Sequence, residues 1–321
     1  MEKIANLIKH NSNFAILAHS KTDCDAVCSA VCLKLALEGL GKKADVLIDS
    51  NFADQMQSLP HFDSINQKTL DKYDLYICVD TATIERLGRN KYKIMKNRAI
   101  SCGFDHHGTN KRYCKYNYIN ENYSSTCELL YDFFKLIGAK ITREMAHLMI
   151  VGIYTDSGQM TFSCVSPKTM RIASELLKIY GGRIDEILVP IYRSKTMSDF
   201  CLVKITYDKL EIVEDDQIAI VVFENSDLED IKSTYEQTHG IVDIGLSLKS
   251  VQVSLLASED TEQKDCYYVS IRTKGNVSAR EIAEIFGGSG HFNAAGCKIF
   301  DTKQNVHDKL INATKKVLNK C

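Results

Sequence analysis

The chain has 321 residues, and its content of 45% hydrophobic and 25% charged residues is typical of globular proteins and excludes a disordered or membrane-built one. Its 40 Lys and Arg residues nearly balance 41 Asp and Glu residues, which gives a formal net charge of −1. Proteins that coat long nucleic acid carry a basic excess or stripe, so this balance argues against extensive duplex binding. A short anionic substrate, bound by a few local groups, is compatible with it.

Neither a membrane segment nor a secretion signal is expected. The longest apolar runs, residues 30–37 and 148–153, are far too short to span a bilayer. The N-terminus lacks the basic-then-apolar layout of a signal peptide, so we expect a cytoplasmic protein without a membrane partner. None of the 12 cysteines forms a CxxC pair and several lie in apolar runs, which predicts reduced packing residues rather than a zinc site.

The first half of the chain alternates short β-like runs with helical patterns, as a parallel sheet covered by helices does. Strands are predicted at residues 14–18, 44–48, 75–79 and 99–104. Helices are predicted at residues 24–39, 125–136, 143–153 and 168–179. This order of elements predicts an α/β fold with flanking helices.

The second half has a different pattern, in which polar and apolar residues alternate as in antiparallel strands. Strands are predicted at residues 202–213, 218–223, 251–256 and 267–272, and helices at 279–286 and 305–319. Two glycines at 181–182 break the preceding helix, and a connecting segment is predicted after them. We therefore expect a parallel-sheet domain at residues 1–183, a linker at 184–198, and a smaller mixed-sheet α/β domain at 199–321.

Four groups of Asp and His residues stand at the ends of predicted elements of the first domain. They are His19 with Asp23 and Asp25, then Asp80, then Asp105 with His106 and His107, and finally Asp156. Open α/β sheets place ligands at the carboxyl ends of their strands. Each group alone has an ordinary alternative, because Asp also caps helices and forms polar turns. Their conjunction on one rim of one sheet instead predicts a metal site.

Carboxylate and imidazole ligands without thiolate suit manganese or magnesium better than structural zinc. The residues are numerous enough for two ions with bridging ligands. Such a pair can lower the pKa of a coordinated water and neutralise a phosphoryl group during in-line attack. Adjacent histidines point in different directions, so one of His106 and His107 can bind metal while the other faces substrate. The acidic neighbour Asp105 can orient an imidazole or set its tautomer.

These groups resemble the motifs of the DHH phosphoesterases, as His19-x-x-x-Asp23-x-Asp25, Asp80, Asp105-His106-His107 and Asp156. Residues 286–296, Phe-Gly-Gly-Ser-Gly-His-Phe-Asn-Ala-Ala-Gly, resemble the glycine-rich loop of the DHH-associated domain. The order and spacing agree over nearly the whole chain. Within the family, the chain is most similar to the bacterial oligoribonuclease and PAP phosphatase branch.

The resemblance implies two manganese ions, for which magnesium or cobalt could substitute. It assigns His19 and Asp23 to one ion, Asp25, His107 and Asp156 to the other, and Asp80 to both. It also implies that His106 faces the phosphate, where it can stabilise developing charge or assist the leaving oxygen. Asp105 would orient its neighbours. The active site is expected in the cleft between the two domains.

The glycine-rich segment has a physical reason of its own to bind an anion, because backbone without side chains can present several N–H groups to it. The ordinary alternative is a turn between a helix and a strand. The predicted substrate contacts are Arg272, Gly288, Ser289, Gly290 and His291, with the guanidinium of Arg272 gripping a terminal phosphate. Ser289 stands where the family usually has a third consecutive glycine. Its side chain would either crowd the phosphate or add a hydroxyl contact.

The implied function is a manganese-dependent phosphodiesterase that cleaves short oligonucleotides or linear dinucleotides to mononucleotides. Removal of the 3′-phosphate of 3′-phosphoadenosine 5′-phosphate (PAP) is a further activity of this branch. Two alternatives stay open. One is hydrolysis of a cyclic dinucleotide such as cyclic di-AMP, and the other is a nucleotide-sensing protein that does not hydrolyse its ligand. The sequence also leaves open whether the chain forms a homodimer.

Overall fold

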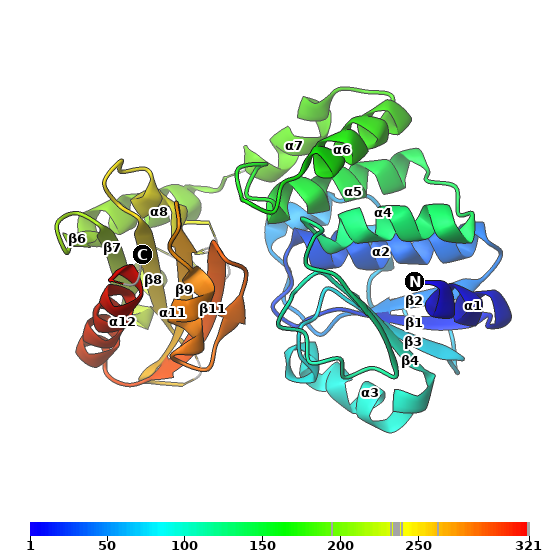
Figure 1. The fold of residues 1–321 in the computed structure, drawn as a ribbon, viewed down its shortest axis with the longest axis horizontal. Helices are drawn as coiled ribbons and strands as arrows, with labels where there is room; N and C mark the ends of the chain where they lie inside the picture. Colours follow the sequence, from blue (N-terminus) through cyan, green and yellow to red (C-terminus); the bar gives the residue numbers. More distant parts are fainter. Residues whose placement is uncertain (194, 232, 234–237, 239, 262, 320–321) are drawn as a thin grey trace. The chain divides into compact units, whose positions relative to one another are not determined.

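The computed structural model describes residues 1–321 except 194, 232, 234–237, 239, 262 and 320–321 (Figure 1). The chain divides into two compact units, Met1–Ser194 and Lys195–Cys321, which are described separately below. Among the described residues, no helix combines the length and the apolar character needed to cross a membrane. The described cysteines are all free thiols, and most of them are buried, as expected for packing residues.

The first unit contains a five-stranded, fully parallel sheet with the strand order β2-β1-β3-β4-β5. Its strands are β1 Asn13–Leu17, β2 Lys43–Leu47, β3 Leu75–Val79, β4 Ser101–Asp105 and β5 Tyr116–Ile119. The chain moves outward from β1 to β2 and then returns to the other side of β1 at β3. Such a reversal opens a crevice beyond the carboxyl ends of β1 and β3, and this is where doubly wound folds bind their ligands.

Helices cover both faces of this sheet (Figure 1). They are α1 Glu2–His10, α2 Cys24–Gly39, α3 Lys91–Asn97, α4 Thr126–Ile137, α5 Arg143–Asp156, α6 Pro167–Tyr180 and α7 Ile184–Tyr192. Short 3₁₀ segments are η1 Asp54–Ser58, η2 Phe62–Ser64, η3 Ile84–Asn90 and η4 Arg98–Ile100. Helices α2, α4 and α5 lie on one face and α3 on the other. Both faces of the central strands are therefore buried, which explains why β1 and β3 are apolar over nearly their full length.

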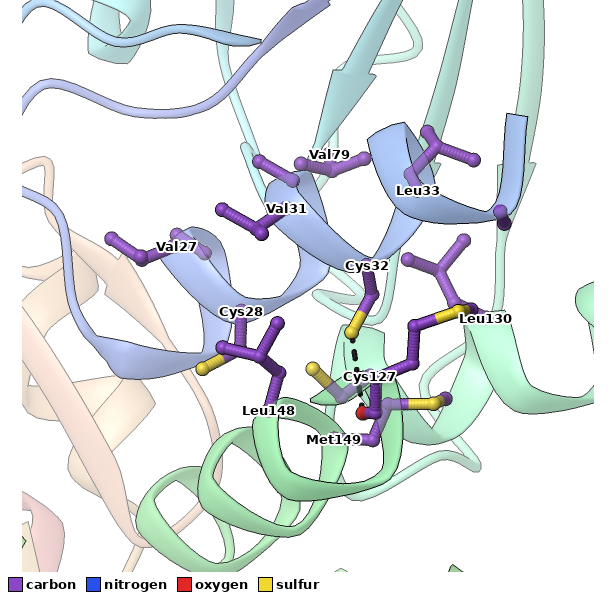
Figure 2. Packing of buried hydrophobic residues seen from close by; sticks show 14 of the residues in the cluster. Val27, Cys28, Val31, Cys32, Leu33, Val79, Cys127, Leu130, Leu148 and Met149 are labelled. Atoms are coloured by element: carbon purple, nitrogen blue, oxygen red, sulfur yellow. Dashed lines mark hydrogen bonds between the residues drawn. The ribbon is translucent and has the colours of Figure 1, made fainter. Parts of the chain in front are cut away.

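Helix α2 packs closely against α4 and α5 through small side chains (Figure 2). Cys28, Cys32 and Cys127 are fully buried in this interface. The Cys32 thiol donates to the backbone carbonyl of Met145 over 3.5 Å. Because cysteine and alanine are small, the first turn of α2 and the N-terminus of α4 can approach each other, and this brings the candidate ligands of both segments together.

The buried carboxylate of Asp45 on β2 holds the segment that leads into β3. It accepts hydrogen bonds from the Thr69 amide and hydroxyl at 3.0 and 2.6 Å, from the Leu70 amide at 3.0 Å, and from the Tyr73 hydroxyl at 2.8 Å. Burial alone would raise the pKa of Asp45, but the hydrogen bonds from Thr69 and Tyr73 outweigh it and lower the pKa. The charged form of Asp45 is thus favoured by folding.

We expect Asp45→Asn to destabilise the protein by about 1.5–3 kcal/mol at neutral pH, because an amide cannot accept all of these bonds. A carboxylate whose pKa falls on folding stabilises the protein above its unfolded pKa, and this contribution is lost as the pH falls through the folded pKa. The difference in stability between wild type and variant should therefore shrink below about pH 4. Urea unfolding at several pH values measures it, with exposed Asp71→Asn as the control. A difference that does not depend on pH would contradict the prediction.

The second unit contains a six-stranded mixed sheet with the order β10-β11-β9-β8-β7-β6. Its strands are β6 Glu211–Val213, β7 Ile218–Phe223, β8 Val253–Glu259, β9 Cys266–Thr273, β10 Ser289–Gly290 and β11 Ala294–Phe300. Its helices are α8 Met197–Lys209, α9 Asn225–Asp230, α10 Asp243–Leu246, α11 Ala279–Glu284 and α12 Lys303–Leu318. Only the β7–β8 pair is parallel. The predicted fold class, a parallel-sheet domain followed by a mixed-sheet domain, is confirmed.

The strand predicted at residues 202–213 is wrong for most of its length. The structure has helix α8 up to Lys209 and a strand only at Glu211–Val213. Thr196 and Asp199 form a capping box that starts this helix, and Leu202 and Thr206 are buried four residues apart on one helical face. The β-branched residues Val203 and Ile205 between them favour strands by propensity, but the cap and the core contacts decide the outcome.

The segment predicted as a linker, residues 184–198, is largely helical. Helix α7 occupies its first part, and Ile187 and Ile191 on α7 are buried in the core of the first unit. Its apolar stripe at a spacing of four residues is the signal that a connecting segment would lack. Most of this range therefore belongs to the first unit.

Candidate metal centre

The loop after β1 delivers two of the predicted ligands, His19 and Asp23, to the switch point of the sheet. His19 is buried, and its Nε2 lies 3.6 Å from Asp23 Oδ2 and 3.7 Å from Asp80 Oδ2. Asp23 is also the N-cap of α2, where its Oδ1 accepts from the Ala26 amide at 3.0 Å. The helix-capping role and the ligand role of Asp23 therefore do not exclude each other, because each uses a different carboxylate oxygen.

Asp25 lies in the first turn of α2 and is held by the N-terminus of α4. Its Oδ2 accepts from the Thr126 amide at 2.7 Å, and its Oδ1 accepts from the Cys127 amide at 3.0 Å. Burial, and the nearby carboxylates of Asp80 and Asp156, raise the pKa of Asp25 well above its ordinary value. A buried carboxylate among other carboxylates is costly unless a cation compensates its charge, so this position favours a cation.

Asp80 follows β3 directly and lies at the centre of the group. Its Oδ1 lies 3.5 Å from His106 Nε2 and 3.6 Å from His107 Nδ1, and its Oδ2 faces His19. The Thr126 hydroxyl donates to Oδ1 at 3.0 Å. The backbone of Asp80 has φ 51°, a left-handed conformation that costs a non-glycine residue about 1 kcal/mol or more. The carboxylate of Asp80, carried on this strained backbone, thus lies close to His19, His106 and His107.

The two adjacent histidines have different surroundings. His106 is buried, with Nδ1 at 3.2 Å from the Tyr123 carbonyl and Nε2 at 3.0 Å from Asp156 Oδ2. Because a carbonyl oxygen only accepts, Nδ1 carries the hydrogen in the neutral ring and Nε2 is left as the ligand atom. His107 is less buried, and its Nδ1 lies 2.7 Å from Asp105 Oδ1. Its Nε2 is therefore directed away from that carboxylate.

The donor atoms fall into sets compact enough to hold metal ions. His19, Asp23 and Asp80 offer ligand atoms within 4.8 Å of one another, and so do Asp25, His106 and Asp156. Asp80 belongs to the first set and approaches His106 of the second. The donors are oxygen and imidazole nitrogen, which suit manganese or magnesium.

His19 provides the clearest sign that a cation belongs here. Both of its ring nitrogens are buried, and among the described residues neither has a hydrogen-bond partner. Burial and Arg86 lower the pKa of His19, but Asp23 and Asp80 outweigh them and raise it to about 9. Such a field attracts positive charge, and a divalent ion would take the place of the proton. The residues present therefore fit a divalent metal centre.

Comparison with known proteins places these motifs in a family. Residues 13–153 match the N-terminal domain of the DHH family, and residues 209–320 match the DHHA1 domain. The chain belongs to the DHH family. Members of this family depend on metal, and the acidic and histidine centre described above is the corresponding candidate site in this chain.

Several curated DHH relatives resemble the chain along almost its full length. A bifunctional oligoribonuclease and PAP phosphatase NrnA of Thermus thermophilus is 26% identical over 95% of this chain and 90% of its own. A Streptococcus mutans protein named probable bifunctional oligoribonuclease and PAP phosphatase NrnA is 27% identical over 96% of this chain and 97% of the length of that protein. The similarity thus includes both domains.

Solved structures support the same fold. An exopolyphosphatase-related protein from Bacteroides fragilis superimposes with a TM-score of 0.87 and 24% identity, over 98% of this chain and 95% of that chain. RecJ from Thermus thermophilus, solved with Mn²⁺, has a TM-score of 0.55 and 12% identity, over 99% of this chain and 54% of that chain. At these identities the comparison establishes the fold and not the activity.

The two histidines of the DHH motif have different neighbours in the structure. His107 was expected to join Asp25 and Asp156, with His106 facing the phosphate. His106 Nε2 lies beside Asp156, whereas His107 lies beside Asp105 and also belongs to a candidate ligand set with Asp80, Asp105 and His106. The orientation of His106 is set by the Tyr123 carbonyl, which is 17 residues away in the sequence and gives no signal in the motif.

Sequence analysis also missed residues that hold the centre together. Thr126 binds Asp25 through its amide and Asp80 through its hydroxyl, so the start of α4 fixes two candidate ligands. Asn110 donates to Asp105 Oδ2 at 2.6 Å. The run of hydroxyl residues at 124–126 predicts a helix N-cap, but its contacts with residues far away in the sequence cannot be inferred from that pattern.

In the second unit, the glycine-rich loop explains why a serine is tolerated at position 289. Gly287 and Gly290 have φ of 72° and 153°, which glycine adopts most easily. A Cβ on Gly288 would lie 2.3 Å from the Gly296 carbonyl oxygen. Ser289 has no positive φ and pairs with Gly296 as part of β10. The departure from three consecutive glycines therefore falls where a side chain is sterically acceptable.

The other predicted substrate contacts lie around the same loop. Arg272 on β9 is in register with Ala294 of β11, and the turn between β10 and β11 contains His291. The His291 amide donates to the Ala294 carbonyl at 2.7 Å, which closes this turn. Arg272 Nε lies 3.9 Å from Asp243 Oδ1. The sheet thus brings Arg272 and the glycine loop to one end of β9 and β11.

Gly152 of α5 leaves room for the metal centre, and we expect Gly152→Ala to disturb it. A Cβ there would lie 2.4 Å from Cys127 Sγ and 2.8 Å from Asp25 Oδ1. The overpacking should cost about 1–3 kcal/mol and displace Asp25, so that affinity for Mn²⁺ also falls. Calorimetric titration and thermal unfolding measure both effects. Gly39→Ala is the control, since nothing lies within 4 Å of its added Cβ. Equal metal affinity in the two variants would contradict the prediction.

Proposed function

We propose that this chain is a two-metal phosphoesterase that hydrolyses short oligoribonucleotides, linear dinucleotides and PAP, with Mn²⁺ as its resident cation. The observation that supports this most directly is the buried imidazole of His19 between Asp23 and Asp80, whose ring nitrogens have no hydrogen-bond partner among the described residues, next to a second set of candidate ligands. The substrate class rests on relatives of the full chain that are named oligoribonuclease and PAP phosphatase. The free cysteines suit a reducing compartment, and we propose a cytoplasmic location.

In this proposal each residue has a defined part. His19 and Asp23 would hold one ion, Asp25, His106 and Asp156 would hold the other, and Asp80 lies close to both groups of residues. Bound divalent ions supply the Lewis acidity that neutralises a phosphoryl group and lowers the pKa of a water. Thr126 keeps Asp25 and Asp80 in place through the hydrogen bonds described above.

The second histidine of the DHH motif acts on the substrate. Asp105 fixes Nδ1 of His107 by a hydrogen bond, so Nε2 is the atom available to the leaving oxygen. A proton held on that nitrogen would assist departure of the leaving group. Asn110 donates to the second oxygen of Asp105 and keeps that carboxylate from rotating. The pair of Asp105 and His107 is therefore a proton-donating unit, and His106 is not.

In the second unit, Arg272, Gly288, Ser289, Gly290 and His291 are proposed to bind a terminal phosphate. Arg272 can offer its guanidinium, and the loop can offer backbone amides. A pocket that binds one end of the substrate favours short oligonucleotides and the release of mononucleotides. The near-zero net charge agrees with this, because few phosphates need to be neutralised.

The test is a product analysis with Mn²⁺ on pApA, cyclic di-AMP, PAP and a ladder of short RNAs. Mononucleotides from pApA and the shortest RNAs are expected, together with AMP from PAP. Faster turnover of cyclic di-AMP than of pApA would indicate that the cyclic dinucleotide is the preferred substrate. Tight binding of a dinucleotide without turnover would favour a sensing protein. Absence of both binding and turnover for all four substrates would refute the proposal.

A further inference from the structure

Arg86 lies on a turn that contacts the loop carrying His19, although no motif includes it. It belongs to η3, the turn that follows Asp80 and β3. The Arg86 carbonyl accepts from the Ser20 amide at 2.7 Å, so this turn is fixed to the loop directly after His19. Gly88 makes the close approach possible, because a Cβ there would lie 3.0 Å from Ser20 Cβ and 2.7 Å from Asp49 Oδ2.

The side chain of Arg86 has different surroundings from that of Arg89 on the same turn. Arg89 is 89% exposed and its Nε donates to Asp49 Oδ1 at 2.8 Å. Arg86 is half-buried, and within the part of the chain that the structure describes its guanidinium forms no ion pair or side-chain hydrogen bond. A partly desolvated guanidinium without a carboxylate partner, on a turn that is hydrogen-bonded to the loop directly after His19, is available to an anion.

The charge balance of the centre explains what such a cation would be for. Asp23, Asp25, Asp80, Asp105 and Asp156 carry five negative charges when ionised. Two divalent ions, together with the proton that the proposed function places on His107, would bring the charge of the centre to zero. A phosphodiester is itself an anion, and a centre without net charge would give it little electrostatic attraction. One further cation next to the ions would give the centre a positive charge that attracts the phosphodiester.

We propose that Arg86 binds a non-bridging oxygen of the phosphoryl group held at the metal centre and that it is a substrate-contacting residue of the reaction. The planar guanidinium can place two N–H groups on one phosphate, which a lysine cannot. This deepens the proposed function and rests on it. Neither the DHH motifs nor the glycine loop includes this position.

The test compares Arg86→Ala, Arg86→Lys and Arg89→Ala in the manganese-loaded protein. We expect kcat/KM on pApA to fall about 10²- to 10³-fold in Arg86→Ala, as when one preorganised donor is removed. The kcat/KM of Arg86→Lys should fall less, because lysine keeps the charge but lacks the paired N–H groups of the guanidinium. Added guanidinium ion should partly restore the kcat/KM of Arg86→Ala. Arg89→Ala should stay within about threefold of wild type, because its ion pair is at the surface. Equal turnover of Arg86→Ala and Arg89→Ala would overturn the proposal.

A binding measurement separates this proposal from the proposed function. Calorimetric titration with inorganic phosphate should show about 10- to 100-fold weaker binding to manganese-loaded Arg86→Ala than to Arg89→Ala. Mn²⁺ stoichiometry and thermal unfolding should be the same in both variants. If wild type cleaves none of the nucleotides, the proposed function fails while the phosphate titration still tests Arg86. If phosphate binds equally to both variants, Arg86 has no such role whatever the substrate is.

Discussion

Asp80→Asn is expected to abolish turnover, by about 10³-fold or more, while the protein stays folded. Asp80 faces His19, His106 and His107, and the proposed function assigns it to both ions. The amide keeps an oxygen for the Thr126 hydroxyl. Asparagine also tolerates the left-handed φ of 51° at this position. The substitution therefore removes the charge and leaves the local backbone intact.

The effect of Asp80→Asn on Mn²⁺ binding should be measurable without any substrate. A ligand that binds only the folded state raises stability by about 2.7 kcal/mol at a hundredfold excess over its Kd. Adding Mn²⁺ should raise the Tm of wild type and should hardly affect Asp80→Asn. Asp215→Asn is the matched control, because Asp215 has the same φ of 51° but is exposed. An Asp80→Asn protein that keeps the full Mn²⁺-dependent rise in Tm would rule out the central role of this carboxylate.

The sequence was sufficient for those parts of the fold in which local signals agree with tertiary packing. The predicted bounds of α2 and β3 match the structure, because Asp23 caps the helix and β3 is an uninterrupted apolar run. The edge strand β5 was missed since its four residues are only half-buried and partly polar. β11 was missed because its first residues had already been interpreted as the end of the glycine loop.

The metal centre shows the same limit. The four groups of candidate ligands could be selected from the sequence because each is adjacent to an element with a clear pattern, and a parallel sheet brings strand ends together. The contact between Asp25 and the start of α4 spans about a hundred residues and has no local signature. Arg86 is likewise positioned by a backbone hydrogen bond to Ser20, which no pattern of side chains reveals.

His106→Asn and His107→Asn should separate the two histidines of the DHH motif. Asparagine Nδ2 can replace imidazole Nδ1 as a donor, to the Tyr123 carbonyl in one case and to Asp105 in the other. Each variant therefore loses mainly the Nε2 atom. We expect His106→Asn to lose one of the two Mn²⁺ ions, because Nε2 faces Asp156 and Asp80. We expect His107→Asn to keep both ions and to lose about 10²- to 10⁴-fold in kcat.

A substrate with a better leaving group makes the distinction sharper. If His107 supplies a proton to the leaving oxygen, bis(p-nitrophenyl) phosphate needs that proton far less than a dinucleotide does, because nitrophenolate leaves readily as an anion. Its hydrolysis by His107→Asn should then approach the wild-type rate, whereas His106→Asn should stay impaired on both substrates. The number of bound Mn²⁺ ions in each variant, together with its kcat on the dinucleotide and on bis(p-nitrophenyl) phosphate, distinguishes the two roles. If His107→Asn loses an ion, or if His106→Asn keeps both, the two roles are the reverse of those proposed.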